Sequence, residues 1–338
     1  MTKYKKYIMI ITAMAIFSTI SGLYAQSGIE PYEIERVGLS GWQFLKINGS
    51  SRQTAMGGAF AAVSNSGAEA IFGNPAALTG IKNMDVLLGK VNWIADIGYQ
   101  SVAIVKNFGS IGTFGISVVS VDMGDMAETI NSPISGENRT EAVITGNTFT
   151  AGDIAAGLSY AKKVTDRLSI GGSVRWIREK IADVSMDNVS VDFGTLYYTG
   201  FRSLRLAMVA RNFGPDDHLV GWSEEYQSEA VDIRMPIDFR VGLAMDFFEG
   251  SDMNLLTATV EGVHPNDGPE KVNVGVEYSM AGMVYLRAGY RFNYDEESFT
   301  LGGGFNYKVG NVSARINYAY VDFGLLKRVH MFSLGFSM

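Results

Sequence analysis

Residues 271–338 consist of short segments in which apolar and polar side chains alternate. In the first of these segments, Val272 and Val274 alternate with Asn273. Side chains two residues apart share one face of a β-strand, so each segment presents one apolar face and one polar or small face. Strands of about ten residues with this pattern, joined by tight turns, are typical of a transmembrane β-barrel.

Alternation also occurs in soluble β-sandwiches, whose apolar faces turn inward, so this alternative has to be weighed. The apolar faces here carry no charged residue along the whole strand, and Arg or Lys at a bilayer midplane costs about 2–4 kcal/mol. Aromatic residues such as Tyr290, Phe299 and Tyr307 gather toward the strand ends, where a lipid–water boundary favours them. These features, with the export signal described below, favour the membrane barrel.

Fourteen strands are predicted along the chain, which gives an all-β, fourteen-stranded antiparallel transmembrane β-barrel with an N-terminal plug. Their ranges are 84–94, 98–107, 110–121, 151–162, 167–180, 189–198, 202–212, 237–248, 253–263, 270–280, 282–293, 298–309, 310–322 and 329–338. Because an even number of strands returns the chain to the side where it started, we expect both termini to be periplasmic.

The predicted connections differ in length according to the strand that they follow. Those after even-numbered strands are tight, whereas the long ones follow odd-numbered strands. The long connections are residues 122–150, 181–188, 213–236 and 264–269. Outer-membrane barrels have short periplasmic turns and longer extracellular loops, so we expect residues 122–150 and 213–236 outside the cell.

The N-terminus has the form of a cleaved signal peptide, with an uncleaved anchor as the alternative. Lys3, Lys5 and Lys6 precede an apolar stretch that is too short for an ordinary spanning helix, and small residues precede a cut after Ala25. The chain contains no cysteine, and its net charge is −7, which argues against a nucleic-acid partner. We therefore predict export to the outer membrane of a Gram-negative-type bacterium.

Residues 26–83 lack a period of two and are rich in small residues between positions 50 and 80. We interpret this segment as a plug inside the barrel, with a loose periplasmic tail as the alternative, because Gly and Ala allow close backbone packing. The residues that define the expected plug motif are Arg52, Gly57, Gly58, Asn74, Pro75 and Ala76. The chain thus divides into a signal peptide at 1–25, the N-terminal segment at 26–83 and a barrel at 84–338.

Motifs spread along the chain carry a resemblance to a known family. They include Ser51-Arg52, Ala55-Met56-Gly57-Gly58-Ala59, Asn74-Pro75-Ala76, Val191-Asp192-Phe193-Gly194, Arg211-Asn212-Phe213-Gly214, Glu261 with His264-Pro265-Asn266-Asp267, Leu286-Arg287-Ala288-Gly289-Tyr290 and Asn317-Tyr318-Ala319-Tyr320. In their order and spread, the chain resembles the PorV/PorQ family of outer-membrane proteins, which are relatives of the FadL-type barrels.

The resemblance implies an N-terminal hatch that contains the Asn-Pro-Ala element and is lodged in the barrel. It also implies a part in type IX protein secretion, in which exported cargo proteins bind at the outer membrane and are presented to the secretion and surface-attachment machinery. The fold-level relation to FadL-type barrels suggests an alternative, a transporter of hydrophobic small molecules. A purely structural role is a third reading.

Catalytic and metal-binding motifs are absent from the sequence, so we expect neither an enzyme nor a cofactor. The three histidines, His218, His264 and His330, form no closely spaced pair, and the sequence has no GxSxG, P-loop or HExxH motif. The acidic pairs at 216–217 and 224–225 suit solvated loop charges better than a divalent-cation site.

Two further groups of residues are assigned from the pattern. Charges of both signs on the polar strand faces, including Arg175, Glu261 and Arg287, are expected to hold the plug, because a selective ion pathway favours one sign. Trp222 and Tyr226, in the predicted outer loop 213–236, are candidate partner-binding residues, because aromatic side chains are enriched in interfaces. They are alternatively contacts to lipopolysaccharide or a cap on the barrel.

Overall fold

The fold is seen in a computed structural model that describes residues 38–133, 139–218, 232–249, 251, 253–326 and 328–338. Contacts within the chain separate residues 36–338 from the residues before them, and the barrel lies wholly in this larger unit. The predicted signal peptide at 1–25 lies outside the described residues. Within the part of the chain that is described, no helix has the length and apolar character needed to cross a membrane.

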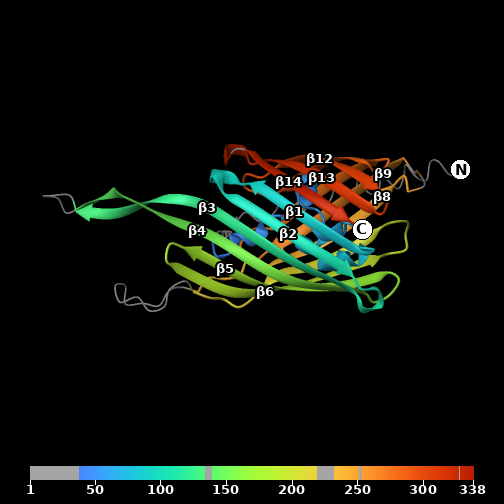
Figure 1. Cartoon of the computed structure of the whole chain (residues 1–338), viewed down its shortest axis with the longest axis horizontal. Coiled ribbons are helices and arrows are strands. Elements are labelled where there is room, and N and C mark those ends of the chain that lie inside the picture. The colour runs from blue at the N-terminus through green and yellow to red at the C-terminus, as the bar shows by residue number, and fades with distance from the viewer. Residues whose placement is uncertain (1–37, 134–138, 219–231, 250, 252, 327) are drawn as a thin grey trace, which may run out of the picture. The chain divides into compact units, whose positions relative to one another are not determined.

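Fourteen antiparallel strands close into a barrel, as the sequence predicts (Figure 1). The strands are β1 Met84–Asn92, β2 Gly98–Asn107, β3 Thr113–Pro133, β4 Thr140–Lys163, β5 Leu168–Ile181, β6 Val184–Tyr198, β7 Arg205–Phe213, β8 Asp238–Phe247, β9 Asn254–Pro265, β10 Lys271–Met280, β11 Val284–Phe292, β12 Phe299–Val309, β13 Val312–Asp322 and β14 Arg328–Ser337. Each strand pairs with its neighbours in sequence, and β1 also pairs with β14, which closes the ring.

The period of two sorts the side chains of the wall as predicted. On β10, Val272 and Val276 are exposed on the outer face, whereas Asn273 and Glu277 are buried on the inner face. Outward apolar side chains on the other strands are similarly open, such as Leu286 at 57% exposure. An apolar outer wall that encloses a polar interior is the arrangement that lipid imposes on a barrel, because lipid offers no partners for polar groups.

The barrel has two ends, which we call the loop end and the turn end. Connections from odd- to even-numbered strands lie at the loop end, and those from even- to odd-numbered strands lie at the turn end. Met338 pairs with Met84 at the turn end. Near the first described residues, Ser40 pairs with Arg234 in the β7–β8 connection, which belongs to the loop end. The described part of the chain therefore begins at the loop end and reaches β1 at the turn end.

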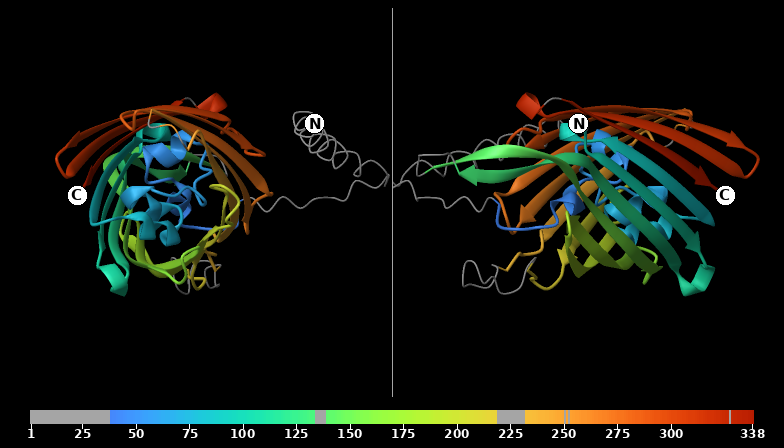
Figure 2. Two further views of the ribbon diagram at one scale, coloured as in Figure 1. Left: turned by 90° about the vertical axis from the view of Figure 1, so that its right-hand side faces the viewer. Right: turned by 60° about the vertical axis from the view of Figure 1, so that its left-hand side comes forward.

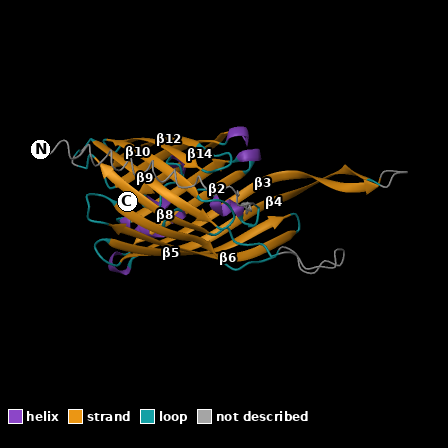
Figure 3. Ribbon diagram, turned by 180° about the vertical axis from the view of Figure 1, so that it is seen from behind, coloured by secondary structure: helices purple, strands orange, loops and turns teal. Residues whose placement is uncertain are grey.

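Two of the predicted long loops are wrong. Residues 122–150 are mostly strand, because β3 and β4 continue as a two-stranded ribbon that extends well beyond the other strands (Figures 1 and 3). Residues 181–188 are mostly strand as well, since only Ala182 and Asp183 separate β5 from β6. Loop length therefore follows strand parity less strictly than the sequence suggests.

The β3–β4 ribbon, residues 123–133 and 139–150, starts where both neighbouring strands stop pairing. The last β2 partner of β3 is Asp122, and the first residue of β4 that pairs with β5 is Ala151. The β3–β4 register shifts just beyond Asp122, as at a β-bulge. A bulge bends and twists a strand pair, so it redirects the ribbon as it leaves the wall.

Four short helices lie inside the ring of strands (Figure 2). They are η1 Gln43–Lys46, α2 Ser51–Ala55, η2 Gly67–Phe72 and η3 Pro75–Gly80, and three further 3₁₀ turns, η4 Ile94–Asp96, η5 Gly109–Ile111 and η6 Gly324–Leu326, belong to strand connections. Ser50 caps α2 by accepting a hydrogen bond from the Gln53 amide, and Pro75 starts η3. We call residues 38–83 the lumen segment.

Candidate functional site

The lumen segment packs against the inner face of the wall on all sides. The α2 helix contacts β11 to β14, η2 contacts β1 to β3, and η3 contacts β3 to β6. Most of its residues from Ser50 to Leu78 are buried. These contacts place the segment within the barrel. That it acts as a plug, in the sense of closing the lumen to solutes, stays a prediction.

Arg52, the first residue of the expected plug motif, is held by a buried carboxylate of the wall. Its Nε and Nη2 atoms each donate to Glu277 at 2.7 Å, and Arg287 Nε donates to the same carboxylate at 2.6 Å. Close by, Arg315 Nη2 donates to Asp85 at 2.6 Å. We call these five residues the ion-pair cluster. Since Arg52 lies on α2 and the others lie on strands, the cluster fixes the lumen segment to the wall.

Glu69 on η2 is buried beside the ion-pair cluster. Burial raises the pKa of its carboxyl above the ordinary value, although Arg52, Arg315 and Arg287 act in the opposite direction. Asn317 Nδ2 donates to Oε1 at 3.4 Å, while Oε2 has no hydrogen-bond partner among the described residues. The carboxylates of Glu69, Glu277 and Asp85 thus all lie near guanidinium groups. This arrangement favours a structural rather than a transport role for them.

Gly57 and Gly58 lie where the lumen segment approaches strand β10. Both have left-handed backbone angles, with φ at 69° and 84°. A Cβ atom on Gly57 would lie 2.7 Å from the carbonyl oxygen of Val274 on β10. Glycine is therefore required at position 57 both by conformation and by space.

Asn74, Pro75 and Ala76 join the lumen segment to the opposite side of the wall. Asn74 Oδ1 accepts from the Ala76 amide at 2.9 Å, which caps η3, and Nδ2 donates to the Thr195 carbonyl of β6 at 3.0 Å. On β5, a Cβ atom at Gly171 would lie 2.6 Å from the Ala76 nitrogen, so the helix lies directly on the strand. The six motif residues predicted from sequence thus contact two opposite parts of the wall.

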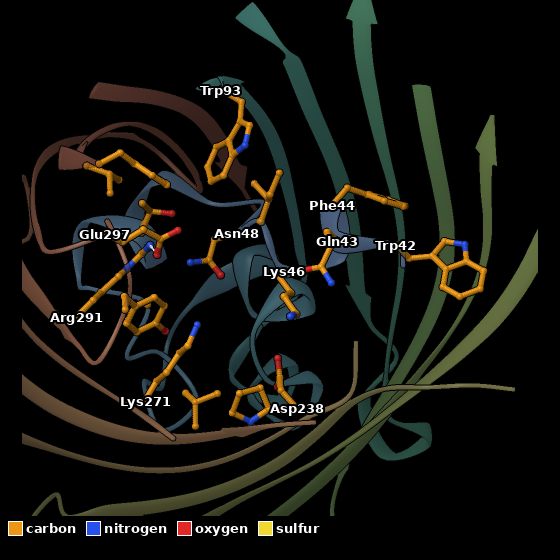
Figure 4. A pocket seen from close by; sticks show the side chains of 18 of the residues that line it. Trp42, Gln43, Phe44, Lys46, Asn48, Trp93, Asp238, Lys271, Arg291 and Glu297 are labelled. Carbon is orange, nitrogen blue, oxygen red and sulfur yellow. Dashed lines mark hydrogen bonds and ion pairs between the residues drawn. The ribbon is translucent and has the colours of Figure 1, made fainter. Parts of the chain in front are cut away.

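Between the lumen segment and the loop end lies a cavity of about 580 Å³ (Figure 4). Phe44 and Ile47 of the lumen segment line it together with Trp93, Val121 and Phe323 of the strands and their connections. Trp93 and Phe323 pack edge to face, with their ring centroids 5.0 Å apart. This size and apolar lining are typical of sites for small organic ligands.

Several charged residues also line the cavity, and most of them have partners. Lys46 Nζ lies 2.6 Å from Asp267, and Arg240 donates to Asp238 at 2.8 Å. Arg291 pairs with Glu297. The Lys271 ammonium lies 4.2 Å from the ring centroid of Tyr294, and the side chains of Lys46 and Lys271 point toward the middle of the cavity in Figure 4.

The hydrogen-bond partners of Asp267 change the pKa of its carboxyl. Burial acts to raise the pKa of its carboxyl, but hydrogen bonds from Lys46, Ser40 and Gln43 outweigh it and lower the pKa below the ordinary value. The carboxylate therefore stays ionised and ties η1 to the β9–β10 connection.

Asp153 and Glu179 also line the cavity, but neither belongs to the ion pairs described above. They face each other across β4 and β5, and Trp42 donates its backbone amide to Glu179 Oε2 at 3.3 Å. Asp153 Oδ1 has no hydrogen-bond partner among the described residues, although the side chain is buried. Both positions follow the inward period of two, which is the sequence signal that identifies them.

The described part of the chain shows the surroundings of its acidic residues and of two histidines. No group of three or more His, Cys, Asp or Glu residues suited to a metal ion occurs there. His330 contacts the Tyr318 hydroxyl at 2.8 Å, and His264 contacts Glu270 at 3.1 Å. The candidate partner-binding residues Trp222 and Tyr226 lie outside the described residues.

No protein-family profile matches the chain, and no curated protein matches it in sequence. Several solved structures have the same fold. The CymD monoaromatic hydrocarbon channel has a TM-score of 0.55 at 15% identity, over 85% of this chain and 97% of its own. The Ralstonia pickettii toluene transporter TbuX has a TM-score of 0.52 at 15% identity, over 85% and 96%. A Pseudomonas aeruginosa FadL homologue has a TM-score of 0.52 at 13% identity, over 86% and 97%.

Identities this low show a shared fold and no more. The fold is that of FadL-type barrels, and two of the proteins named above are described as a channel and a transporter. None of these matches is a PorV/PorQ protein, so this part of the resemblance remains without support from the comparisons.

Proposed function

We propose that the chain is an outer-membrane barrel that binds small hydrophobic molecules in the cavity at the loop end and transports them across the membrane. The observation that carries this proposal is the cavity of about 580 Å³, in which apolar and aromatic side chains lie above the buried lumen segment. The likeness to CymD and TbuX supports it, since those proteins are described as a monoaromatic hydrocarbon channel and a toluene transporter.

Location in the outer membrane, after removal of a signal peptide at 1–25, is part of the same proposal. The apolar outer wall supports it, because lipid-facing side chains such as Ile116 and Leu286 are more than half exposed. The lumen segment would then separate the cavity from the periplasm, which requires bound molecules to leave by a route other than straight through the barrel axis.

Uptake of radiolabelled toluene tests the proposal. A Gram-negative host that expresses the protein should take up toluene several-fold faster than the same host with a non-expressing vector. Val321 lines the cavity, so Val321→Phe should reduce this increase in the uptake rate, because the larger side chain fills part of the cavity. The matched control is Ile316→Phe, since Ile316 lies on the same strand and faces lipid. Equal uptake with and without the protein contradicts the proposal.

A second candidate function is the one that the sequence resemblance implies, namely binding of exported proteins for type IX secretion. The observation that favours it is the β3–β4 ribbon, whose neighbours stop pairing at Asp122 and Ala151. Ile130, Val143 and Ile144 are exposed on it. Unpaired strand edges with exposed apolar side chains suit the addition of a partner strand.

Affinity capture from detergent-solubilised outer membranes tests this candidate. A variant with residues 124–149 replaced by a short Gly-Ser turn should fold and lose captured secretion components and cargo. The Trp222→Ala/Tyr226→Ala variant tests the other candidate partner-binding residues. If neither change affects capture, while Val321→Phe reduces toluene uptake, the small-molecule function stands alone.

A further inference from the structure

Asp153 and Glu179 form a carboxylate pair with an unusual setting. The two residues are direct cross-strand partners on β4 and β5, and both line the cavity. Like charges directly opposite each other on one sheet face are destabilising. A wall built only for stability has no reason to keep such a pair, because the adjacent strands β5 and β6 place oppositely charged residues together, as with Arg175 and Asp192 at 2.6 Å.

The surroundings of the pair are apolar. The partner of Asp153 on β3 is Val121, and the inward-facing neighbours along β4 and β5 include Ala155 and Ile177. Asp153 is 6% exposed, and its Oδ1 atom has no hydrogen-bond partner among the described residues. A buried ionised oxygen without a partner costs free energy, so a positively charged or hydrogen-bond-donating group that faces this side chain would stabilise its ionised form.

The basic residues of the cavity are engaged elsewhere. Lys46 pairs with Asp267, Arg240 with Asp238, and Arg291 with Glu297. The Lys271 ammonium lies against the Tyr294 ring. None of these side chains pairs with Asp153 or Glu179. The Trp42 amide donates to Glu179 Oε2 at 3.3 Å, whereas Asp153 Oδ1 remains without a partner among the described residues.

A divalent metal ion fits this pair poorly. Calcium takes six to eight oxygen ligands and magnesium six, whereas the described residues offer no cluster of three or more acidic or histidine ligands here. An organic ammonium group needs fewer acceptors, and its apolar body suits the aromatic lining formed by Trp93, Phe323 and Phe44.

We propose that Asp153 and Glu179 are the cation-recognising end of the cavity and bind the ammonium group of a small aromatic amine. This rests on the proposed function, because it names the class of molecule that the same cavity takes. The amine donates hydrogen bonds to Asp153 Oδ1 and to the Glu179 carboxylate, while its ring lies among the apolar residues. The single positive charge of the ligand offsets one of the two like charges, so binding reduces their repulsion.

Binding of three probes with similar aromatic bodies tests the inference. The purified full-length protein in detergent is equilibrated with phenethylamine, 2-phenylethanol or phenylacetate at pH 7.5, and affinity is measured by equilibrium dialysis. Phenethylamine should bind at least about tenfold more tightly than 2-phenylethanol, since charged hydrogen bonds are stronger than neutral ones. Phenylacetate should bind most weakly.

The Asp153→Asn/Glu179→Gln variant keeps the side-chain shapes and removes both charges. Its ratio of amine to alcohol affinity should fall to about one. The matched control is Asp187→Asn, which removes an exposed carboxylate on neighbouring β6 that pairs with Arg178 outside the cavity. Its ratio should stay at the wild-type value. A heat-dependent shift on a denaturing gel establishes that each variant has folded.

The possible outcomes separate the two proposals. Equal binding of the amine and the alcohol to the wild type overturns the inference and leaves the proposed function intact, with the two carboxyls simply sharing a proton. Tighter binding of phenylacetate assigns the charge preference to Lys271 and also overturns the inference. Displacement of phenethylamine by calcium at equimolar concentration makes the pair a metal site. If no probe binds, the proposed function fails as well.

Discussion

Two regions of the lumen contain buried charges but use them differently. In the ion-pair cluster, Glu277 accepts hydrogen bonds from both Arg52 and Arg287, so its charge is fully compensated. At the cavity, Asp153 and Glu179 face each other with no cation between them among the described residues. Both regions lie on the same polar inner face of the same wall. The difference indicates that the first region holds the lumen segment and the second receives a ligand.

Deleting residues 52–78 should have the largest effect, because it removes the α2, η2 and η3 contacts and the floor of the cavity together. We expect a stable open channel, with single-channel conductance in planar bilayers several-fold above that of the wild type. Unchanged conductance would show that the lumen segment does not close the barrel, and the plug prediction would be wrong.

Glu277→Ala breaks the ion-pair cluster and leaves two buried guanidinium groups without their shared acceptor. Removing one partner of a buried ion pair costs about 3–5 kcal/mol in unfolding free energy. Unfolding in guanidinium chloride, monitored by tryptophan fluorescence, measures this loss of unfolding free energy. The control is Asp187→Ala, which breaks an exposed pair on the outside of the barrel and should have a far smaller effect. Similar losses for both variants would contradict the structural role of the cluster.

Filling the cavity tests whether the cavity, and not the ion-pair cluster, determines ligand binding. Val321→Phe should weaken toluene binding about tenfold, or about 1.4 kcal/mol, because the added ring occupies ligand space. The unfolding free energy should change by less than in Glu277→Ala. If Ile316→Phe, on the lipid face of the same strand, weakens binding equally, toluene binds to the outer wall and not in the cavity.

The smallest effect is expected at the Lys46–Asp267 pair, which ties η1 to the rim of the cavity. Since the pKa of Asp267 is lowered in the fold, the pair stabilises above the ordinary carboxyl pKa and is lost as pH falls through the lower, folded value. The difference in unfolding free energy between wild type and Asp267→Asn should be about 0.2–1 kcal/mol at pH 7 and vanish once the pH falls below the lowered pKa of Asp267. A difference that grows toward low pH would have the wrong sign.

Much of the wall could be predicted from sequence, because lipid and lumen impose opposite demands on alternate residues. The alternation places Asn273 and Glu261 on polar strand faces, and both side chains are buried inside the barrel. The ribbon was missed for the same reason. Beyond Asp122 both faces of the β3–β4 ribbon are exposed, so residues of β4 such as Thr145 and Asn147 do not alternate with apolar ones.

The cavity was less accessible to sequence reasoning. Trp42 and Phe44 belong to a segment without a period, so their neighbours follow only from tertiary packing. The Asp153–Glu179 pair was predictable in principle, since the tight connection between β4 and β5 fixes which residues face each other. Its lack of a partner was not, because that depends on which side chains of the lumen segment reach it.

Photolabelling tests the central claim most directly, namely that the cavity at the loop end binds hydrophobic small molecules. A small aryl diazirine is photolysed with the purified protein, with and without excess toluene, and the labelled residues are identified by mass spectrometry. Lipid-facing residues should be labelled in both samples. Label at Trp93, Phe44 and Phe323 should appear without toluene and disappear with it. Label confined to lipid-facing residues and unaffected by toluene would contradict the account.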